Sequence, residues 1–277
     1  MDFFKMQGCG NDYIYFDCFD TIIPNPDELS IRLSDRHFGI GGDGIVLILP
    51  SSVADARMRM FNADGSEGRM CGNAIRCVAK YLYESGRVKQ DRMLVETLSG
   101  FKELRLTVMD ESVSGVCVDM GRAEFSPSLI PMLLKEEQVV NHPLEVGGET
   151  YQITCVSMGN PHCVVFVDDP QKFPIEAVGP LFEHHTAFPD GVNTEFVRVD
   201  DEGTLTMRVW ERGSGETLAC GTGACACVAA AVANGYCQAG QEITVHLRGG
   251  DLLIKVTNET VFMTGSAEFV FSGTVDI

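Results

Sequence analysis

The sequence predicts a mixed α/β (α+β) protein made of two pseudo-symmetric domains, each with short strands around one buried helix. Three observations lead to this prediction. Sequence features recur at an offset of 149 residues, a helix-like segment follows each of two cysteines, and β-rich runs occur in both halves. At 277 residues the chain is long for one compact domain and has enough residues for two domains of ordinary size.

The repeat consists of a Gly-Asn pair, a glutamate and a Cys-Gly step, each of which occurs once in both halves. The pairs that lie 149 residues apart are Asn11 and Asn160, Glu67 and Glu216, and Cys71 and Cys220. This period is too long for a solenoid unit and indicates a duplicated domain. We divide the chain into residues 1–119 plus 267–277 and residues 120–266. We expect the two copies to face each other, with a small-molecule site in the cleft.

The two helices of this plan begin directly after the cysteines. The first is predicted over residues 72–84, with Gly86 as its C-terminal stop. The second is predicted over residues 221–233 and ends at Asn234-Gly235. Its residues are apolar or small all the way round, so we expect this helix to be buried on every side.

Strands are predicted where β-rich or alternating runs occur between these helices. In the first half the runs are residues 13–19, 45–49, 57–61 and 103–109. In the second half they are residues 163–168, 194–199, 205–210, 242–247 and 252–257. The expected plan of each half is therefore a central helix wrapped by short strands.

Charge and cysteine content narrow the classes of function. The net charge is −18 and is spread along the chain, which argues against nucleic acid or an anionic membrane as a partner. No signal peptide and no apolar span are found, so the eleven cysteines are expected to be reduced thiols in the cytoplasm. There is no CxxC and no zinc-like Cys/His spacing, and we expect neither metal nor cofactor.

Cys71 and Cys220 are candidate acid/base groups because each stands at the mouth of a helix. The helix dipole and the unpaired N–H groups of the first turn favour a thiolate, lowering a pKa of about 8.5. The N–H groups that follow each cysteine form a ready cradle for a carboxylate. They belong to Gly72 and Asn73 in the first half and to Gly221 and Thr222 in the second.

Two opposed thiols around one carbon can invert a stereocentre without a cofactor. One thiolate removes the α-proton and the other thiol returns a proton from the opposite face.

Several polar residues near these elements are candidates for substrate contacts, but each also has a purely structural interpretation. Asn11, Asn62, Asn160 and Asn193 could instead cap turns, Glu211-Arg212 could be an ordinary ion pair, and His162 could be a packing residue. Arg69 either lowers the pKa of Cys71 or faces solvent.

Six strings of the sequence resemble the diaminopimelate epimerase family along the whole chain. They are KMQGCGNDY (5–13), RHFGIGGDG (36–44), FNADGSEGRMCGNAIRC (61–77), SMGNPHCVV (157–165), VNTEF (192–196) and ERGSGETLACGTGAC (211–225). The resemblance implies interconversion of LL- and meso-diaminopimelate, for lysine and peptidoglycan precursors, without pyridoxal phosphate or metal. It also implies a homodimer and a β-barrel-like wrap of strands around each central helix.

The resemblance implies roles for particular residues. Cys71 and Cys220 would be the acid/base pair, with His162 as a supporting neighbour. The implied substrate-binding residues are Asn11, Asn62, Gly72, Asn73, Asn160, Asn193, Glu211, Arg212, Gly221 and Thr222. Some family members carry Gln where this chain has Gly44, so no side-chain contact is expected from that position.

Three other interpretations compete with this one. A proline or hydroxyproline racemase shares the two-thiol design, but its substrate has no distal amino-acid group to hold. A thiol–disulfide redox protein would be expected to carry a CxxC motif. A non-catalytic binding domain would have no need for twin cysteines at helix starts.

Overall fold

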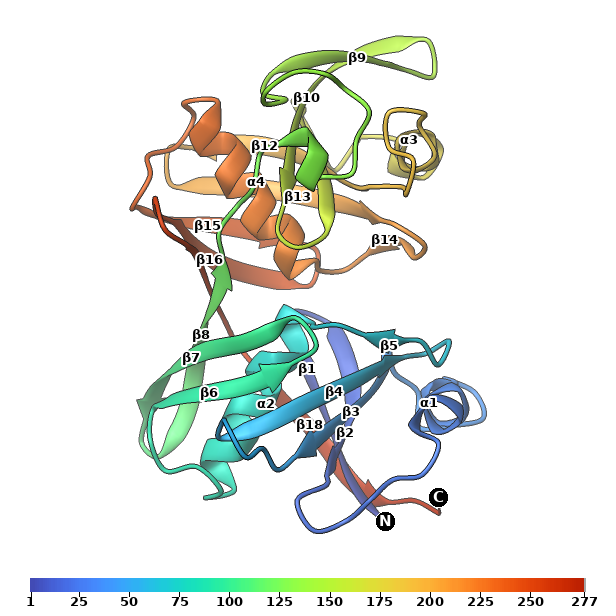
Figure 1. Ribbon diagram of the computed structural model, residues 1–277, viewed down its shortest axis with the longest axis vertical. Coiled ribbons are helices and arrows are strands. Elements are labelled where there is room, and N and C mark those ends of the chain that lie inside the picture. Colours follow the sequence, from blue (N-terminus) through green and yellow to red (C-terminus); the bar gives the residue numbers. More distant parts are fainter. Residues whose placement is uncertain (277) are drawn as a thin grey trace. The chain divides into compact units, whose positions relative to one another are not determined.

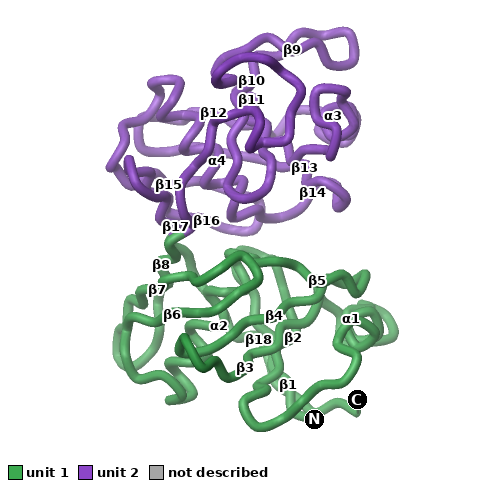
Figure 2. Tube along the Cα trace, in the orientation of Figure 1, with its two compact units in different colours: residues 1–119, 264–277 green, residues 120–263 purple. Residues whose placement is uncertain are grey.

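The computed structural model describes residues 1–276, which fold into two compact units (Figures 1 and 2). The first unit comprises Met1–Asp119 together with the C-terminal segment from Thr264. The second unit comprises Met120–Met263. Two stretches of chain therefore connect the units, one after Asp119 and one after Met263.

The strands of the first unit surround helix α2, and most of them pair with strands that are neighbours along the chain (Figure 1). The elements are β1 (Asp2–Gly8), β2 (Asn11–Asp17), α1 (Pro26–Ser34), β3 (Gly44–Leu49), β4 (Ala56–Asn62), β5 (Glu67–Gly68), α2 (Gly72–Glu84), β6 (Arg92–Thr97), β7 (Gly100–Met109), β8 (Ser112–Gly121) and β18 (Glu268–Thr274). Pairing is parallel between β2 and β3 and between β4 and β6. It is antiparallel for β18–β1–β2, β3–β4–β5 and β6–β7–β8.

The second unit repeats this arrangement around helix α4. Its elements are η1 (Pro127–Leu129), β9 (His142–Val146), β10 (Glu149–Ser157), β11 (Pro161–Phe166), α3 (Ile175–Glu183), β12 (Asn193–Asp201), β13 (Thr204–Glu211), β14 (Gly215–Thr217), α4 (Gly221–Ala233), β15 (Glu242–Leu247), β16 (Gly250–Val256) and β17 (Val261–Gly265). Pairing is parallel for β11–β12 and β13–β15. It is antiparallel for β9–β10–β11, β12–β13–β14 and β15–β16.

The duplication extends to the hydrogen-bond register of the strands. Tyr13 lies opposite Gly44 between β2 and β3. His162 lies opposite Asn193 between β11 and β12. These two positions are each 149 residues after Tyr13 and Gly44, so the same register recurs with different residues. The predicted fold of two similar units, each with strands around a helix, is confirmed.

Both central helices have the predicted bounds, Gly72–Glu84 and Gly221–Ala233. Gly86 and Gly235 follow them with φ of 76°, the left-handed conformation that ends a helix and that glycine adopts most easily. Apart from its C-terminal end, α4 is buried nearly all round, as its small and apolar residues predict. α2 differs because it also buries the polar side chains of Arg76 and Lys80.

Two further helices, α1 and α3, were not predicted. Each is nine residues long and they stand 149 residues apart, so they also belong to the repeat. α1 begins at Pro26, whereas α3 contains Pro180 in its interior. A short segment with an internal proline gives a weak helical signal because proline lacks the N–H that a helix uses.

Each glutamate of the repeat clamps the hairpin that precedes its cysteine. Glu67 of β5 forms a bidentate ion pair with Arg59 of β4, with distances of 2.6 and 3.0 Å. Glu216 of β14 pairs in the same way with Arg208 of β13, at 2.7 and 2.9 Å. These glutamates therefore hold the approach to each helix and explain why the sequence repeats them.

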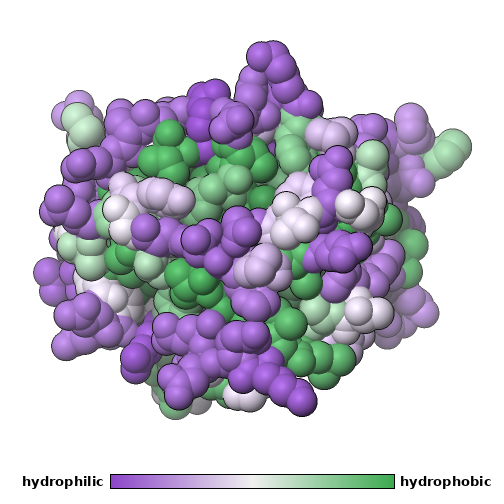
Figure 3. Space-filling model, turned by 90° about the horizontal axis from the view of Figure 1, so that it is seen from above, coloured by the Kyte–Doolittle hydropathy of each residue, from purple (hydrophilic) through white to green (hydrophobic). Residues whose placement is uncertain are grey.

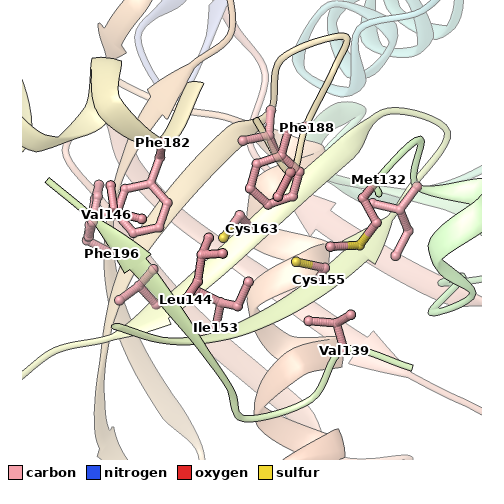
Figure 4. Close-up of a cluster of buried hydrophobic side chains, with 14 of the residues drawn as sticks. Met132, Val139, Leu144, Val146, Ile153, Cys155, Cys163, Phe182, Phe188 and Phe196 are labelled. Atoms are coloured by element: carbon pink, nitrogen blue, oxygen red, sulfur yellow. The ribbon is translucent and has the colours of Figure 1, made fainter. Parts of the chain in front are cut away.

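One apolar core of the second unit lies between its strands and α3 (Figure 4). Phe182 and Phe196 pack edge to face with ring centroids 5.8 Å apart. Cys155 and Cys163 lie opposite each other on β10 and β11, and both are fully buried. Burial raises the pKa of the Cys163 thiol well above its ordinary value, so this cysteine serves as a small apolar residue.

Hydrophilic residues are distributed over the face shown in Figure 3, with hydrophobic ones between them. The acidic residues that give the net charge of −18 are likewise spread along the chain. Within residues 1–276, no helix is both long enough and apolar enough to cross a membrane.

Candidate active site

In the first unit, the Cys71 thiol lies at the start of α2 beside Asn11. Cys71 is the N-cap of the helix and has an extended backbone, with φ of −130° and ψ of 123°. Its Sγ donates to Asn11 Oδ1 at 3.3 Å, and Asn11 Nδ2 donates to Asp43 Oδ2 at 2.7 Å. Because a carboxylate only accepts, Asp43 fixes which end of the Asn11 amide faces the thiol.

Asp43, the partner of Asn11, belongs to a cluster of charged side chains. Arg36 Nη2 lies 2.7 Å from Asp12 Oδ1 and 3.0 Å from Asp43 Oδ1, while Lys5 Nζ lies 2.6 Å from Asp12 Oδ2. Burial by itself raises the pKa of Asp12, but hydrogen bonds from Arg36 and Lys5 bring it below its usual value. Burial raises the pKa of Asp43. The two basic residues thus hold Asp12 ionised at the base of the site.

In the second unit, hydrogen bonds connect the start of α4 to a buried histidine. Cys220 Sγ lies 3.5 Å from Thr222 Oγ1, which accepts from Asn160 Nδ2 at 3.3 Å. Asn160 Oδ1 lies 3.1 Å from His162 Nε2, and His162 Nδ1 lies 2.7 Å from Glu195 Oε1. His162 and Glu195 are both fully buried. A single chain of contacts therefore runs from Glu195 to the thiol.

The Cys220 thiol has a pKa well above its ordinary value. Burial is the first cause, and the negative charges of Glu211 and Glu195 add to it. Hydrogen bonds from Thr222 and from the Gly223 N–H, which lies 3.4 Å from Sγ, act in the opposite direction. The expectation that the helix start lowers the pKa is therefore wrong for Cys220, because burial and two carboxylates outweigh the helix N–H groups.

Glu211 ends β13 and is half-buried near Cys220. Burial raises the pKa of Glu211, and hydrogen bonds from Thr217 and from the Cys220 thiol oppose that rise. Thr217 Oγ1 donates to Glu211 Oε1. The Glu211 carboxylate and the Cys220 thiol therefore influence each other's pKa.

Replacing Glu211 with Gln should lower the pKa of Cys220. The substitution removes the nearest negative charge, and such a charge shifts a neighbouring pKa by about one to three units. We expect the titration midpoint of Cys220 to fall by this order when it is followed by ¹³C NMR of cysteine labelled at Cβ. The exposed Glu202→Gln serves as the control. An unchanged midpoint would mean that the Glu211 charge does not act on this thiol.

Asn193 and Arg212 are joined by a hydrogen bond between the Asn193 side chain and the Arg212 backbone. Asn193 Oδ1 accepts from the Arg212 N–H at 3.0 Å, and Asn193 Nδ2 donates to the Pro161 carbonyl at 2.8 Å. The Arg212 guanidinium donates to the Asp190 carbonyl at 2.8 Å and is solvent-exposed. The structure therefore places Asn193 as a brace between β11 and β13, beside the Arg212 backbone.

Asn62 ends β4, where it lies opposite Gly44 of β3. Its Nδ2 donates to Ser66 Oγ at 3.0 Å, and its backbone N–H donates to the Ser66 carbonyl at 2.9 Å. Asn62 thus closes the turn between β4 and β5. Arg69, between β5 and α2, is exposed to solvent.

The residues after each cysteine form the first turns of the two central helices. Gly72 and Asn73 begin α2, and Gly221 and Thr222 begin α4. Asn73 Nδ2 lies 3.5 Å from Asn11 Oδ1, so its side chain joins the group around Cys71. N–H groups at such positions have no acceptor inside the helix and point towards an incoming anion.

The two halves share a framework but differ in chemistry at equivalent positions. Residues 149 apart are Tyr13 and His162, Gly44 and Asn193, Val46 and Glu195, and Asn62 and Glu211. The first unit thus has apolar or neutral residues where the second has a histidine and two carboxylates. Cys220 therefore has more carboxylates at these positions around it than the sequence repeat alone suggests.

Two residues that contact the candidate site, Asp43 and Glu195, were not singled out in the sequence. Asp43 belongs to a Gly-Gly-Asp-Gly run that has the composition of an ordinary turn. Glu195 is a charged residue in the β-rich run Thr194–Val199, and a carboxylate inside a predicted strand was the one signal in the sequence that could have found it, since a charge that becomes buried requires a partner. Across residues 1–276, no group of three or more His, Cys, Asp or Glu side chains is arranged to hold a metal ion.

Comparison with known proteins gives relatives over the full chain. The model of the diaminopimelate epimerase family matches residues 3–126 and 154–270, and each segment contains one of the two cysteines. Diaminopimelate epimerase of Acetivibrio thermocellus is 53% identical over 279 residues, covering 100% of this chain and 99% of that protein.

Among solved structures, a PhzF-family phenazine biosynthesis protein of Bacillus anthracis has a TM-score of 0.75 at 17% identity, covering 100% of this chain and 99% of the other. A probable proline racemase from Agrobacterium radiobacter has a TM-score of 0.73 at 14% identity, covering 100% and 93%.

The fold is thus one that racemases and phenazine biosynthesis proteins share, here with a cysteine before each central helix. At this identity the likeness to those structures shows only the fold. The sequence match is far closer, and the chain belongs to the diaminopimelate epimerase family. It is an isomerase.

Proposed function

We propose that this chain interconverts LL- and meso-diaminopimelate in the synthesis of lysine and peptidoglycan precursors. Family membership over the full length supports this substrate. One structural observation carries the proposal: each unit presents a cysteine as the N-cap of its central helix, at equivalent positions of the repeat.

Cys71 and Cys220 act as the two acid/base groups of the proposed reaction. Since the pKa of Cys220 is raised, Cys220 rests as a thiol and is able to give a proton. One of the two cysteines serves as the base for one stereoisomer, and the roles exchange for the opposite stereoisomer. Both thiols must reach the same α-carbon, which one deprotonates and the other reprotonates.

The substrate carboxylate beside the reacting carbon is proposed to bind the N–H groups at the starts of the two central helices. These groups can also stabilise the charge that develops when the α-proton leaves. The residues concerned are Gly72, Asn73, Gly221 and Thr222. Further substrate contacts are proposed for Asn11, Asn62, Asn160, Asn193, Glu211 and Arg212, with His162 as a supporting neighbour.

The test is an isomer assay with the purified chain, reducing agent and no added cofactor. LL-diaminopimelate should be converted to the meso form, whereas L-proline and trans-4-hydroxy-L-proline should remain unchanged. These two compounds lack the distal amino-acid group that the polar residues are proposed to hold. Conversion of proline without conversion of diaminopimelate would contradict the proposed substrate.

We also propose that the chain forms a homodimer in the cytoplasm. Its cysteines are all thiols, as is usual in a reducing compartment. Strand β18 exposes Phe269, Val270 and Phe271 by 54, 52 and 42%, an apolar surface suited to a second copy. Light scattering after gel filtration should give a dimer for the native chain and a monomer for Phe269→Ser/Val270→Ser. A native monomer at micromolar concentration would contradict the proposal.

A further inference from the structure

We propose that Glu195 is a positioning residue that, through His162 and Asn160, directs the Thr222 hydroxyl towards the Cys220 thiol. The inference rests on the proposed function for its meaning in catalysis, although its structural part needs no substrate. Glu195 does not touch the reacting atoms in this scheme. It acts by fixing the donors and acceptors of the groups between itself and the thiol.

The position of Glu195 is unusual for a carboxylate. Glu195 and His162 are each fully buried on neighbouring parallel strands, and Oε1 lies 2.7 Å from His162 Nδ1. The second oxygen, Oε2, is buried with no hydrogen-bond partner. A buried charge with one unsatisfied oxygen is costly, so a fold would keep it only where it has a further role.

The proposed direction of each hydrogen bond follows from the Glu195 carboxylate and from the Asn160 amide, whose Nδ2 faces Thr222. A carboxylate accepts, so His162 Nδ1 carries a proton. His162 Nε2 faces Asn160 Oδ1 at 3.1 Å, and in the proposed arrangement it donates to this oxygen, so that both ring nitrogens carry a proton. Asn160 then turns its Nδ2 to Thr222 Oγ1 at 3.3 Å. The Thr222 hydroxyl, having received this bond, has its own proton left for Cys220 Sγ at 3.5 Å.

The fold does not require a carboxylate at this strand position. The equivalent residue of the first unit is Val46, which is fully buried in β3 as Glu195 is in β12. Gly223 makes room for Glu195, since a Cβ on Gly223 would lie 2.7 Å from Oε1 and 3.2 Å from Cys220 Sγ. A carboxylate packed against the first turn of α4 also lies at the positive end of the helix dipole.

Several titratable groups of the second unit face this chain and enter its charge balance. Glu211 interacts with both His162 and Glu195, and Cys220 with both carboxylates. Cys163 on β11 and Cys227 on α4 also feel the Glu195 charge. Because those two thiols are fully buried and their pKa values are raised, they stay neutral and add no charge to this group.

Glu195→Gln keeps the size of the side chain but removes its charge. We expect His162 to lose one ring proton, Asn160 to reverse its amide, and the Thr222 hydroxyl to turn away from Cys220. The turnover number for diaminopimelate should fall roughly 10- to 100-fold with little change in KM, the range typical of losing a partner that orients a histidine. Glu195→Val, which copies the first unit, should fold and show a similar loss.

The closing experiment joins NMR of ¹⁵N-labelled histidine with a double-mutant cycle. Native protein should show protons on both nitrogens of His162, assigned by their absence in His162→Gln, and Glu195→Gln should show only one. Glu183→Gln, at another buried carboxylate of the unit, should keep both. Thr222→Val retains the backbone N–H, and adding Glu195→Gln to it should cost less than threefold further, because both changes break one chain.

Additive losses in the cycle, or two His162 protons that persist in Glu195→Gln, would overturn the inference. An inactive native enzyme would instead contradict the proposed function. In that event the histidine spectra, which need no substrate, would still decide the role of Glu195.

Discussion

Cys71→Ser and Cys220→Ser should each abolish most of the epimerase activity. A serine hydroxyl has nearly the size of a thiol but is a far weaker acid, so it neither removes the α-proton nor returns one at neutral pH. Loss of a general acid or base lowers rates by about 10²- to 10⁴-fold, and we expect each variant to fall at the high end of that range. Initial rates of isomer conversion in both directions provide the measurement.

The matched control is Cys237→Ser, a change to a buried thiol in the turn after α4. Burial raises the pKa of Cys237, so it is not poised as a base, and its replacement should leave the rate within a few-fold of native. If either of the two variants at the helix starts kept more than a tenth of native activity, the assignment of that cysteine would be wrong.

Gly44→Ala should destabilise the first unit of this chain, in which Gly44 has a backbone conformation that glycine adopts most easily; family members with Gln at this position must have a different local backbone there. Gly44 begins β3 with φ of 155°, a conformation that side chains rarely allow. A Cβ there would lie 2.0 Å from the Phe61 carbonyl oxygen and 2.8 Å from the Tyr13 ring. The substitution must shift the Phe61 carbonyl or the Tyr13 ring, so we expect a loss of about 2 to 4 kcal/mol in the free energy of unfolding.

Urea unfolding of Gly44→Ala beside Gly86→Ala separates the clash from the backbone conformation. Gly86 also has a positive φ, of 76°, but no atom lies within 4 Å of its Cβ position. Its replacement should cost only about 1 to 2 kcal/mol. Equal losses for the two variants would show that crowding at Gly44 is unimportant.

Gly44 also shows where sequence reasoning stops. Its place in the repeat is shared with Asn193, whose side chain braces two strands of the second unit. Nothing in the local sequence shows that the Tyr13 ring fills the corresponding space in the first unit. Close contacts of this kind arise from tertiary packing, which neither turn composition nor periodicity describes.

The central helices could be predicted to the residue because their signals are local. Each follows a Cys-Gly step and stops near a glycine, Gly86 or Gly235, with a left-handed backbone. The short helix α3 was missed because Pro180 stands inside it, and its formation depends on packing against the strands. The offset of 149 residues nevertheless fixed the plan of two similar units.

The site was predicted in outline, while its electrostatics were not. Cys220 was expected to have a lowered pKa from its place at a helix start, a local property. The carboxylates of Glu211 and Glu195 that help to reverse this come from β13 and β12. Such charges meet the thiol only after folding, so their effect could not be inferred from the residues around Cys220.

The central claim is that two different groups move the proton, and deuterium oxide tests it most directly. LL-diaminopimelate would be incubated with native enzyme in this solvent, and the early product and remaining substrate analysed by mass spectrometry. With two thiols, the meso product should carry solvent deuterium at the inverted carbon while the remaining LL substrate stays unlabelled. Meso product that retains the original proton would show that one group serves both faces and would contradict the account.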